Sequence, residues 1–155
     1  MKGLSKKKDI NFEEIFSPVV KMFSIRVVLG LVVSMNLEIE QLDVKTTFLH
    51  GDLDEEIYME QLEGFTIKNK EHLVCRLKKN LYGLKKAPRQ WYRKFDSFMV
   101  EYRYDRTTFD HCVFVKKFSD EEFIILLLYV DDMLIVGRDA GKIDKRKRSW
   151  ASPLK

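Results

Sequence analysis

The chain has 155 residues, of which 45% are hydrophobic and 34% are charged. This composition is sufficient for one buried core and excludes a chain that is disordered by composition. Lys and Arg number 28 against 24 Asp and Glu, and the net charge of +4 permits a polyanionic partner without requiring one.

The first half of the chain predicts one helix and three strands. Residues 1–11 are polar and rich in lysine, which indicates a lead-in rather than a folded element. A helix is expected to begin with Ser17 as its N-cap and Pro18 at its first position, and to continue to about Met35. The residues predicted to form its buried face recur every four positions: Phe23, Val27 and Leu31.

The next segment, residues 37–48, is rich in β-forming side chains, but its apolar positions change phase within the segment. We therefore expect a strand packed on both faces, with Asp43 near its end. Two short strands follow in the prediction, at residues 57–59 and 74–77, with polar loops around them.

The second half predicts a long amphipathic helix and a β-hairpin. The helix is expected to begin at Pro88, and strands are expected at residues 113–118 and 123–136, the latter folded back at Asp131 and Asp132. The apolar side chains of the helix recur at helical spacing: Trp91, Phe95, Phe98 and Tyr102.

The sequence shows no secretory signal and no membrane span. The basic start of the chain is followed by no apolar stretch, and the apolar run at residues 123–130 is shorter than the roughly 20 residues that a span requires. Cys75 and Cys112 lack metal-ligand spacing, which fits a reducing compartment. We expect an intracellular protein, cytoplasmic or nuclear, that is not secreted and has no membrane partner.

The adjacent Asp131 and Asp132 are unusual between apolar strands, because a carboxylate pair there carries mutual repulsion and a desolvation cost. The ordinary interpretation is a solvent-exposed turn, since Asp is a favoured turn residue. The alternative is a site for a divalent cation, which prefers carboxylate oxygens and substrate phosphates. Asp43 is the candidate third ligand, although by itself it is more typical of a strand end.

Three ordered strings, QLDVKTTFLHGDL, LYGLKKAPRQWY and LLLYVDDMLIVG, closely resemble the reverse transcriptase of copia-type long-terminal-repeat retrotransposons. The resemblance extends from Lys2 to about Ile143. It implies an α/β (α+β) fold: a palm with an antiparallel, ferredoxin-like sheet backed by helices, with partial fingers and no thumb.

The resemblance also implies the catalytic residues. The first catalytic aspartate of the family matches Asp43, in a motif where Thr47 replaces Ala, and the Tyr-Val-Asp-Asp motif matches Asp131 and Asp132. These three residues are the expected catalytic and metal ligands. The expected cofactor is a pair of Mg²⁺ ions about 3.5 to 4 Å apart, with Mn²⁺ as an alternative.

Further residues are implied to contact the nucleotide or template. Phe48 is expected to lie beneath the incoming sugar and to exclude a ribose 2′-hydroxyl, whereas composition alone indicates a core aromatic residue. A solvated basic face is the ordinary interpretation of the cluster that follows residue 81. By resemblance, the residues that line the nucleotide and template path are Tyr82, Gly83, Lys85, Arg89 and Tyr129.

The resemblance predicts residues 12–143 as a palm with partial fingers and residues 144–155 as a tail outside the family pattern. Codons for a family-like Glu-Leu-Gly-Lys-Ser-Phe, read one base later, encode the Ser-Trp-Ala-Ser-Pro-Leu at residues 149–154, so we expect a frameshift near the codons of residues 145–148.

The expected function is RNA-directed DNA synthesis by a fragment of a retrotransposon polymerase, weak or absent in the isolated chain. The expected partners are an RNA or DNA template with its primer and deoxynucleoside triphosphates, within a larger polyprotein that contains integrase and ribonuclease H. Two alternatives stay open: a nucleic-acid-binding remnant without catalysis, and an inert relic.

Overall fold

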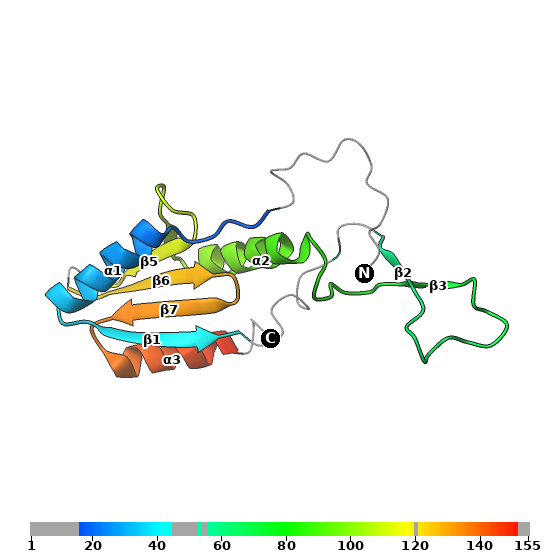
Figure 1. Cartoon of the computed structure of the whole chain (residues 1–155). Coiled ribbons are helices and arrows are strands. Elements are labelled where there is room, and N and C mark those ends of the chain that lie inside the picture. The colour runs from blue at the N-terminus through cyan, green and yellow to red at the C-terminus, as the bar shows by residue number, and fades with distance from the viewer. Residues whose placement is uncertain (1–15, 45–52, 54–55, 120, 152–155) are drawn as a thin grey trace.

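A computed structural model describes residues 16–44, 53, 56–119 and 121–151 of the chain. Its centre is an antiparallel sheet of five strands in the order β1-β7-β6-β5-β4 (Figure 1). The predicted mixed α/β class and the antiparallel sheet are therefore confirmed. The strands of this sheet are β1 (Glu38–Asp43), β4 (Asp105–Arg106), β5 (Val113–Lys117), β6 (Phe123–Tyr129) and β7 (Asp132–Gly137).

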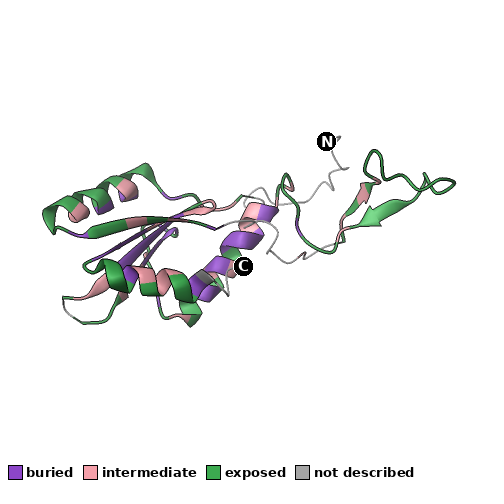
Figure 2. Cartoon of the chain, turned by 90° about the horizontal axis from the view of Figure 1, so that it is seen from below, coloured by how far each residue is buried: buried purple, intermediate pink, exposed green. Residues whose placement is uncertain are grey.

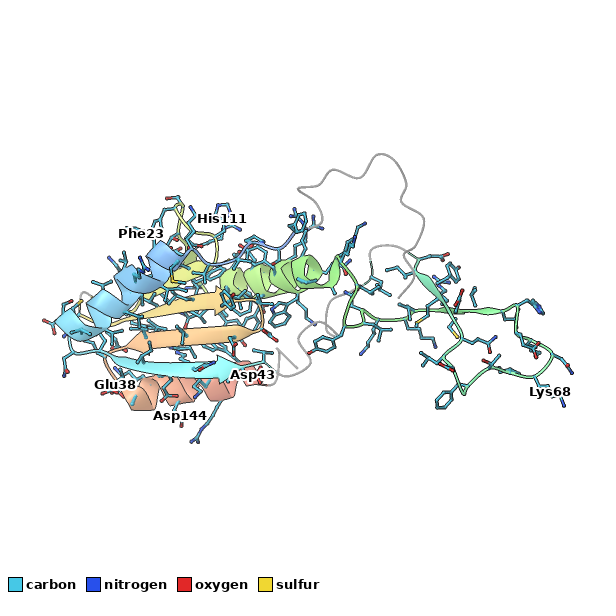
Figure 3. The ribbon with its side chains drawn as sticks, in the orientation of Figure 1. Phe23, Glu38, Asp43, Lys68, His111 and Asp144 are labelled. Atoms are coloured by element: carbon cyan, nitrogen blue, oxygen red, sulfur yellow. The ribbon has the colours of Figure 1, made fainter. Side chains whose placement is uncertain are left out.

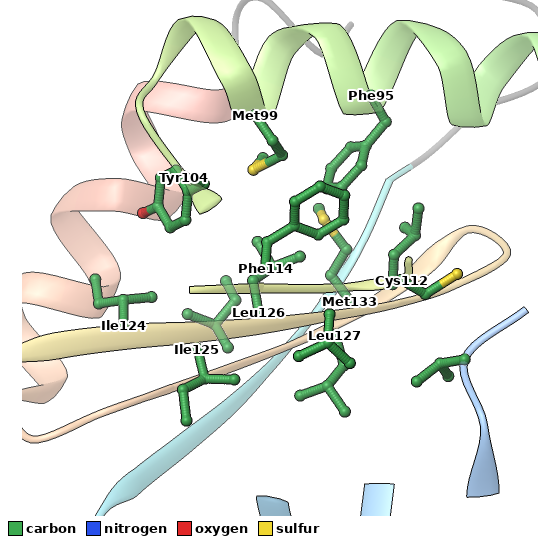
Figure 4. Packing of buried hydrophobic residues seen from close by; sticks show 14 of the residues in the cluster. Phe95, Met99, Tyr104, Cys112, Phe114, Ile124, Ile125, Leu126, Leu127 and Met133 are labelled. Carbon is green, nitrogen blue, oxygen red and sulfur yellow. The ribbon is translucent and has the colours of Figure 1, made fainter. Parts of the chain in front are cut away.

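Helices lie on both faces of the sheet. Helices α2 (Ala87–Glu101) and α3 (Ala140–Ala151) cover one face, and α1 (Met22–Ser34) lies on the other (Figures 1 and 4). Figure 4 shows Phe114 pointing toward α2, whereas Leu127 points to the side of α1. Alternate residues of the buried strands therefore contribute to two hydrophobic layers.

The amphipathic helix predicted from Pro88 is confirmed as α2, which begins one residue earlier with proline in its first turn. Trp91 and Phe95 are almost fully buried, and the Phe95 ring meets the Phe114 ring edge-on with 5.5 Å between centroids. Burial of each such side chain contributes about 1.5–3 kcal/mol. This layer therefore contains large aromatic side chains that are almost fully buried.

The predicted start of α1 is wrong. The helix begins at Met22, and the Ser17 hydroxyl donates a hydrogen bond to the carbonyl of Pro18 instead of capping a helix. The backbone N–H of Lys21, the N-cap residue, donates to the Asp110 carboxylate at 2.8 Å. A carboxylate distant in sequence therefore satisfies the N-terminus, which local capping rules cannot anticipate.

The predicted buried face of α1 is also wrong. Phe23 is 71% exposed and Val27 is 43% exposed, while the buried positions of the helix are Ser24 and Val28. Most side chains of this helix are apolar, so the spacing of apolar residues does not select one face. The Ser24 hydroxyl donates to the Asp110 carboxylate, and this buried contact determines which face meets the sheet.

Strand β1 is not packed on both faces as predicted. It is an edge strand that pairs with β7 alone, and Glu38, Ile39, Gln41 and Asp43 are exposed. The change of phase in its sequence reflects an edge position, where polar side chains are tolerated, rather than burial on two sides. Asp43, which was predicted to lie near the end of this strand, is its last residue.

The two short predicted strands form a separate sheet. β2 (Tyr58–Glu60) pairs antiparallel with β3 (Val74–Arg76), each displaced by at most one residue from its predicted bounds. This hairpin lies away from the five-stranded sheet, and most of its surface is exposed (Figure 2). It contributes nothing to the hydrophobic core.

Helix α3 runs without a break across the predicted domain boundary at residue 143. The Asp139 carboxylate caps its N-terminus by accepting the Lys142 backbone N–H at 3.0 Å. Ile143 and Trp150 are both fully buried, and the Trp150 ring packs edge-on against Tyr104. The described part of the tail therefore packs on the sheet. The frameshift is a statement about the gene and stays a prediction.

None of the helices formed by the described residues is both long enough and apolar enough to cross a lipid bilayer.

Candidate active site

The turn between β6 and β7 contains two residues, Val130 and Asp131, because Tyr129 pairs directly with Asp132. The sequence predicted the fold-back at Asp131 and Asp132, so the turn lies one residue earlier and Asp132 is the first residue of β7. A connection of two residues is the tightest common hairpin and fixes the register of both strands. Asp131 therefore occupies a defined place at the tip.

Val130 adopts a positive φ of 59°, which is rare for a β-branched side chain. Asp131 is absent from the described non-glycine residues with positive φ, and this combination of signs is that of a type II′ turn. Such a conformation costs about 1–3 kcal/mol and persists only where the surroundings enforce it. Strained backbone of this kind is concentrated at functional sites.

Strand β1 brings Asp43 to the same end of the sheet. Asp43 pairs with Asp132 across the β1–β7 ladder, and the Val44 backbone N–H donates to the Asp131 carbonyl at 3.2 Å. Figure 3 shows Asp43 at the end of β1, beside the turn. Directly opposed residues have Cβ atoms about 4.5–5.5 Å apart. The backbone thus gathers all three predicted carboxylates at one corner.

The side chains are less closely gathered than the backbone. Asp43 is exposed, Asp131 and Asp132 are half-buried, and the Gln41 amide donates to Asp132 Oδ1 at 3.0 Å. Among the residues that the structure describes, no group of three or more His, Cys, Asp or Glu side chains is arranged to hold a metal. Three carboxylates supply the hard oxygen donors that a divalent cation prefers, and the Gln41 contact engages only one of the two Asp132 oxygens.

The start of α2 lies against this turn. The indole N–H of Trp91 donates to the Val130 carbonyl with 3.1 Å between Nε1 and the oxygen. The predicted basic segment precedes Trp91 in the sequence. Its Lys85 is exposed and lies two residues before the first residue of α2, Ala87. Arg89 has a different contact: its Nη1 donates to the Phe16 carbonyl at 3.0 Å.

The remaining predicted contact residues lie in a loop, at the end of β6 or outside the described part. Tyr82 and Gly83 are exposed, and Gly83 has a φ of 92°, a conformation that favours glycine. Tyr129 is 53% exposed at the end of β6, next to the turn. Phe48 falls within residues 45–52, which lie outside the described residues. The structure thus brings Tyr129 to the aspartates, and Arg89 and Lys85 to the adjacent helix.

Sequence reasoning missed two residues of this corner, Gln41 and Trp91. Alternation along a strand could have found Gln41, because it precedes Asp43 by two positions and therefore shares its face. Nothing local could have found the role of Trp91, since its hydrogen-bond partner is 39 residues away. Its spacing indicated only a buried aromatic residue.

Comparison with known proteins gives a consistent result. A sequence model described as "Reverse transcriptase (RNA-dependent DNA polymerase)" matches residues 1–155. The chain is 66% identical over 147 residues to the "Retrovirus-related Pol polyprotein from transposon TNT 1-94" of Nicotiana tabacum, covering 95% of this chain and 11% of that protein. No solved structure matches.

More distant relatives extend the same pattern. The "Retrovirus-related Pol polyprotein from transposon RE2" of Arabidopsis thaliana is 42% identical over 138 residues, covering 89% of this chain and 9% of that protein. The "Transposon Ty1-NL2 Gag-Pol polyprotein" of Saccharomyces cerevisiae is 30% identical over 124 residues, covering 79% of this chain and 7% of that protein. This chain therefore spans 11% or less of these relatives. It belongs to the reverse transcriptase (RNA-dependent DNA polymerase) family, in the branch found in copia-type retrotransposon Pol polyproteins.

Proposed function

We propose that the corner formed by β1, β6 and β7 is the nucleotidyl-transfer site of an RNA-directed DNA polymerase, with Asp43, Asp131 and Asp132 as its catalytic carboxylates. The observation that supports this proposal is the register that sets Asp43 opposite Asp132, with Asp131 at the adjoining tip. Two motifs that are 88 residues or more apart in the chain thus meet at one point. An arbitrary exposed turn has no reason to face a third carboxylate.

The reaction proposed is attack of a primer 3′-hydroxyl on the α-phosphate of a deoxynucleoside triphosphate, with pyrophosphate as the leaving group. Bound Mg²⁺, or Mn²⁺, would neutralise the phosphate charge and lower the pKa of the attacking hydroxyl. The three aspartates supply the hard oxygen ligands, and the fixed backbone of the turn holds Asp131 while substrate binds. Because Asp43 is exposed, the corner is open to a polyanionic substrate.

We propose the neighbouring surface as the path of nucleotide and template. Lys85 is exposed just before α2 begins, Tyr129 is exposed next to the turn, and Tyr82 with Gly83 lies in the loop that leads to the helix. Arg89 joins this set with a guanidinium that already contacts the Phe16 carbonyl. Basic side chains suit phosphates, and aromatic side chains suit stacked bases. Phe48 retains its expected role beneath the sugar as a prediction only.

The natural setting proposed is a larger polyprotein with integrase and ribonuclease H, since the relatives are Pol polyproteins and this chain spans 11% of the tobacco one. A primer–template and deoxynucleoside triphosphates are its proposed partners. We expect the 155-residue chain alone to extend primers weakly, because so small a domain offers little surface to hold a duplex.

A second candidate function is binding of nucleic acid without catalysis. It is favoured by the Gln41 contact to Asp132 and by the absence of a preformed three-carboxylate group within the described ranges. The net charge of +4 supports either function equally. The two candidates differ in one measurable property, the dependence of product formation on the aspartates.

Primer extension on poly(rA)/oligo(dT) with Mg²⁺, repeated with Mn²⁺, separates the two candidates. We expect Asp131→Asn to reduce extension by on the order of 10²- to 10³-fold, because an amide cannot supply the negative charge that the site requires. Asp144→Asn is the matched control, since Asp144 forms only an exposed ion pair with Arg148 on α3. If the wild-type chain binds the template without extending the primer, the second candidate is supported. If the chain does neither, an inert relic is supported.

A further inference from the structure

Two carbonyl groups of the β6–β7 turn are held by different parts of the fold. The Val130 carbonyl accepts the indole N–H of Trp91, from α2. The Asp131 carbonyl accepts the backbone N–H of Val44, which follows β1. The turn that presents Asp131 is therefore tied on one side to a buried helix and on the other to the strand that carries Asp43.

The hydrogen bond from Trp91 is made to the central peptide of the turn. Type I′ and type II′ turns differ mainly in the orientation of the central peptide, here the one that joins Val130 to Asp131. A flip of that peptide would carry the Val130 carbonyl away from the indole and impose a positive φ on Asp131. It would also leave the indole N–H without an acceptor, and Trp91 is only 1% exposed.

We propose that Trp91 is a positioning residue for Asp131: its indole N–H locks the central peptide of the turn and so fixes the direction in which the Asp131 side chain leaves the backbone relative to the pair Asp43 and Asp132. The catalytic consequence rests on the proposed function. The conformational claim does not, because it concerns the turn alone.

The chain provides a matched comparison in its other tryptophan. Trp150 is fully buried on α3 and packs against Tyr104 at 5.8 Å between ring centroids, as Trp91 packs against Phe95 at 5.8 Å. The Trp150 indole N–H, however, has no hydrogen-bond partner among the described residues. Substitution of Trp150 thus removes similar aromatic packing without removing a tie to the turn.

The conformational claim is tested by NMR on the full chain. Trp91→Phe removes the N–H together with part of the ring, and replacement of Trp91 by 3-benzothienylalanine removes only the N–H because sulfur takes its place. We expect both changes to shift or double the backbone amide signal of Asp131, whereas Trp150→Phe leaves that signal unchanged. An unchanged Asp131 signal in both position-91 variants overturns the proposal.

The functional claim is tested with Mn²⁺ as the probe, followed by electron paramagnetic resonance, and by primer extension. We expect both position-91 variants to bind Mn²⁺ about 10- to 100-fold more weakly, as is usual when a residue that orients a metal ligand is lost. Extension should fall in kcat more than in KM for the deoxynucleotide, and Trp150→Phe should retain the wild-type values.

The two proposals fail in different ways. Wild-type levels of Mn²⁺ binding and kcat in the benzothienylalanine variant overturn the positioning role of Trp91 and leave the proposed function intact. A wild-type chain that neither binds Mn²⁺ nor extends a primer overturns the proposed function, and the Asp131 amide signal then still decides whether Trp91 locks the turn.

Discussion

The two faces of the sheet are built differently, although the sequence predicted an apolar, core-facing side for both α1 and α2. On the face of α2 and α3, Phe95 and Trp150 are fully buried. On the opposite face, α1 leaves Phe23 71% exposed and Val33 83% exposed. The difference follows from sequence pattern: α2 alternates polar and apolar positions at helical spacing, whereas α1 is apolar on most of its surface.

This contrast shows when periodicity is informative. The polar side chains of α2 exclude all orientations except one, so its buried face can be read from the sequence. In α1, several orientations bury comparable apolar area, and a single polar contact between Ser24 and Asp110 selects among them. A buried carboxylate with three donors can make such a choice because an unmet hydrogen bond there is costly.

The largest expected effect is on the α2 face. Phe95→Ala should lower the free energy of unfolding by about 3–5 kcal/mol, because it leaves a cavity between Trp91 and Phe114. Phe23→Ala on α1 is the matched control and should change it by less than about 0.5 kcal/mol. Urea denaturation followed by circular dichroism measures both. Equal losses would contradict the asymmetry of the two faces.

A smaller loss is expected where α1 is anchored. Asp110→Ala should lower the free energy of unfolding by about 2–3 kcal/mol, because it leaves the Lys21 and Cys112 backbone N–H groups and the Ser24 hydroxyl without their acceptor. Ser24→Ala should have the smaller effect, about 1 kcal/mol, since it removes one of the three donors. The same denaturation experiment compares them, and the reverse order would reject Asp110 as the anchor.

The anchor also predicts a pH dependence. Burial opposes ionisation of Asp110, but hydrogen bonds from Ser24, Lys21 and Cys112, with the charge of Lys21, outweigh it and hold the pKa below its ordinary value of 3.8. A carboxyl group whose pKa is lowered by folding stabilises the folded state at pH values above its ordinary pKa. This stabilisation is lost as the pH falls through the pKa of the folded state. Thermal unfolding of the wild type from neutral to strongly acidic pH should show this loss.

Comparison with Asp110→Ala isolates the contribution of this carboxyl from that of other acids. The difference in melting temperature between wild type and variant should be constant near neutral pH and should shrink under acidic conditions below the ordinary pKa. A difference that stays constant down to the lowest pH at which the chain folds would show that the ionised form of Asp110 provides no stabilisation.

The smallest expected effect concerns the link between α3 and β1. The Lys147 ammonium pairs with the Glu40 carboxylate at 2.5 Å, and these side chains are 23% and 32% exposed. Lys147→Met should lower the free energy of unfolding by about 0.5–1 kcal/mol, an effect that high salt weakens. Arg148→Met, in the more exposed pair with Asp144, is the control and should lower it by about 0.2–0.5 kcal/mol. Denaturation at two salt concentrations tests the order.

Much of the fold was accessible from the sequence because the signals were local. The apolar spacing of α2 and the β-forming runs at residues 113–118 and 123–136 are properties of neighbouring residues, and the structure confirms them within about one or two residues. The start of α1 and its buried face were not accessible, because the Asp110 contacts that set them span 86 residues or more.

The candidate site divides along the same line. The sequence by itself determined the family and predicted the three aspartates, since motif residues keep their order whatever surrounds them. Only the tertiary structure decided the rest. Asp43, on the edge strand β1, pairs with Asp132 on β7, the turn begins at Val130, and the Trp91 indole donates a hydrogen bond to that turn. Register and long-range hydrogen bonds depend on how distant segments meet, and no local pattern of side chains records that.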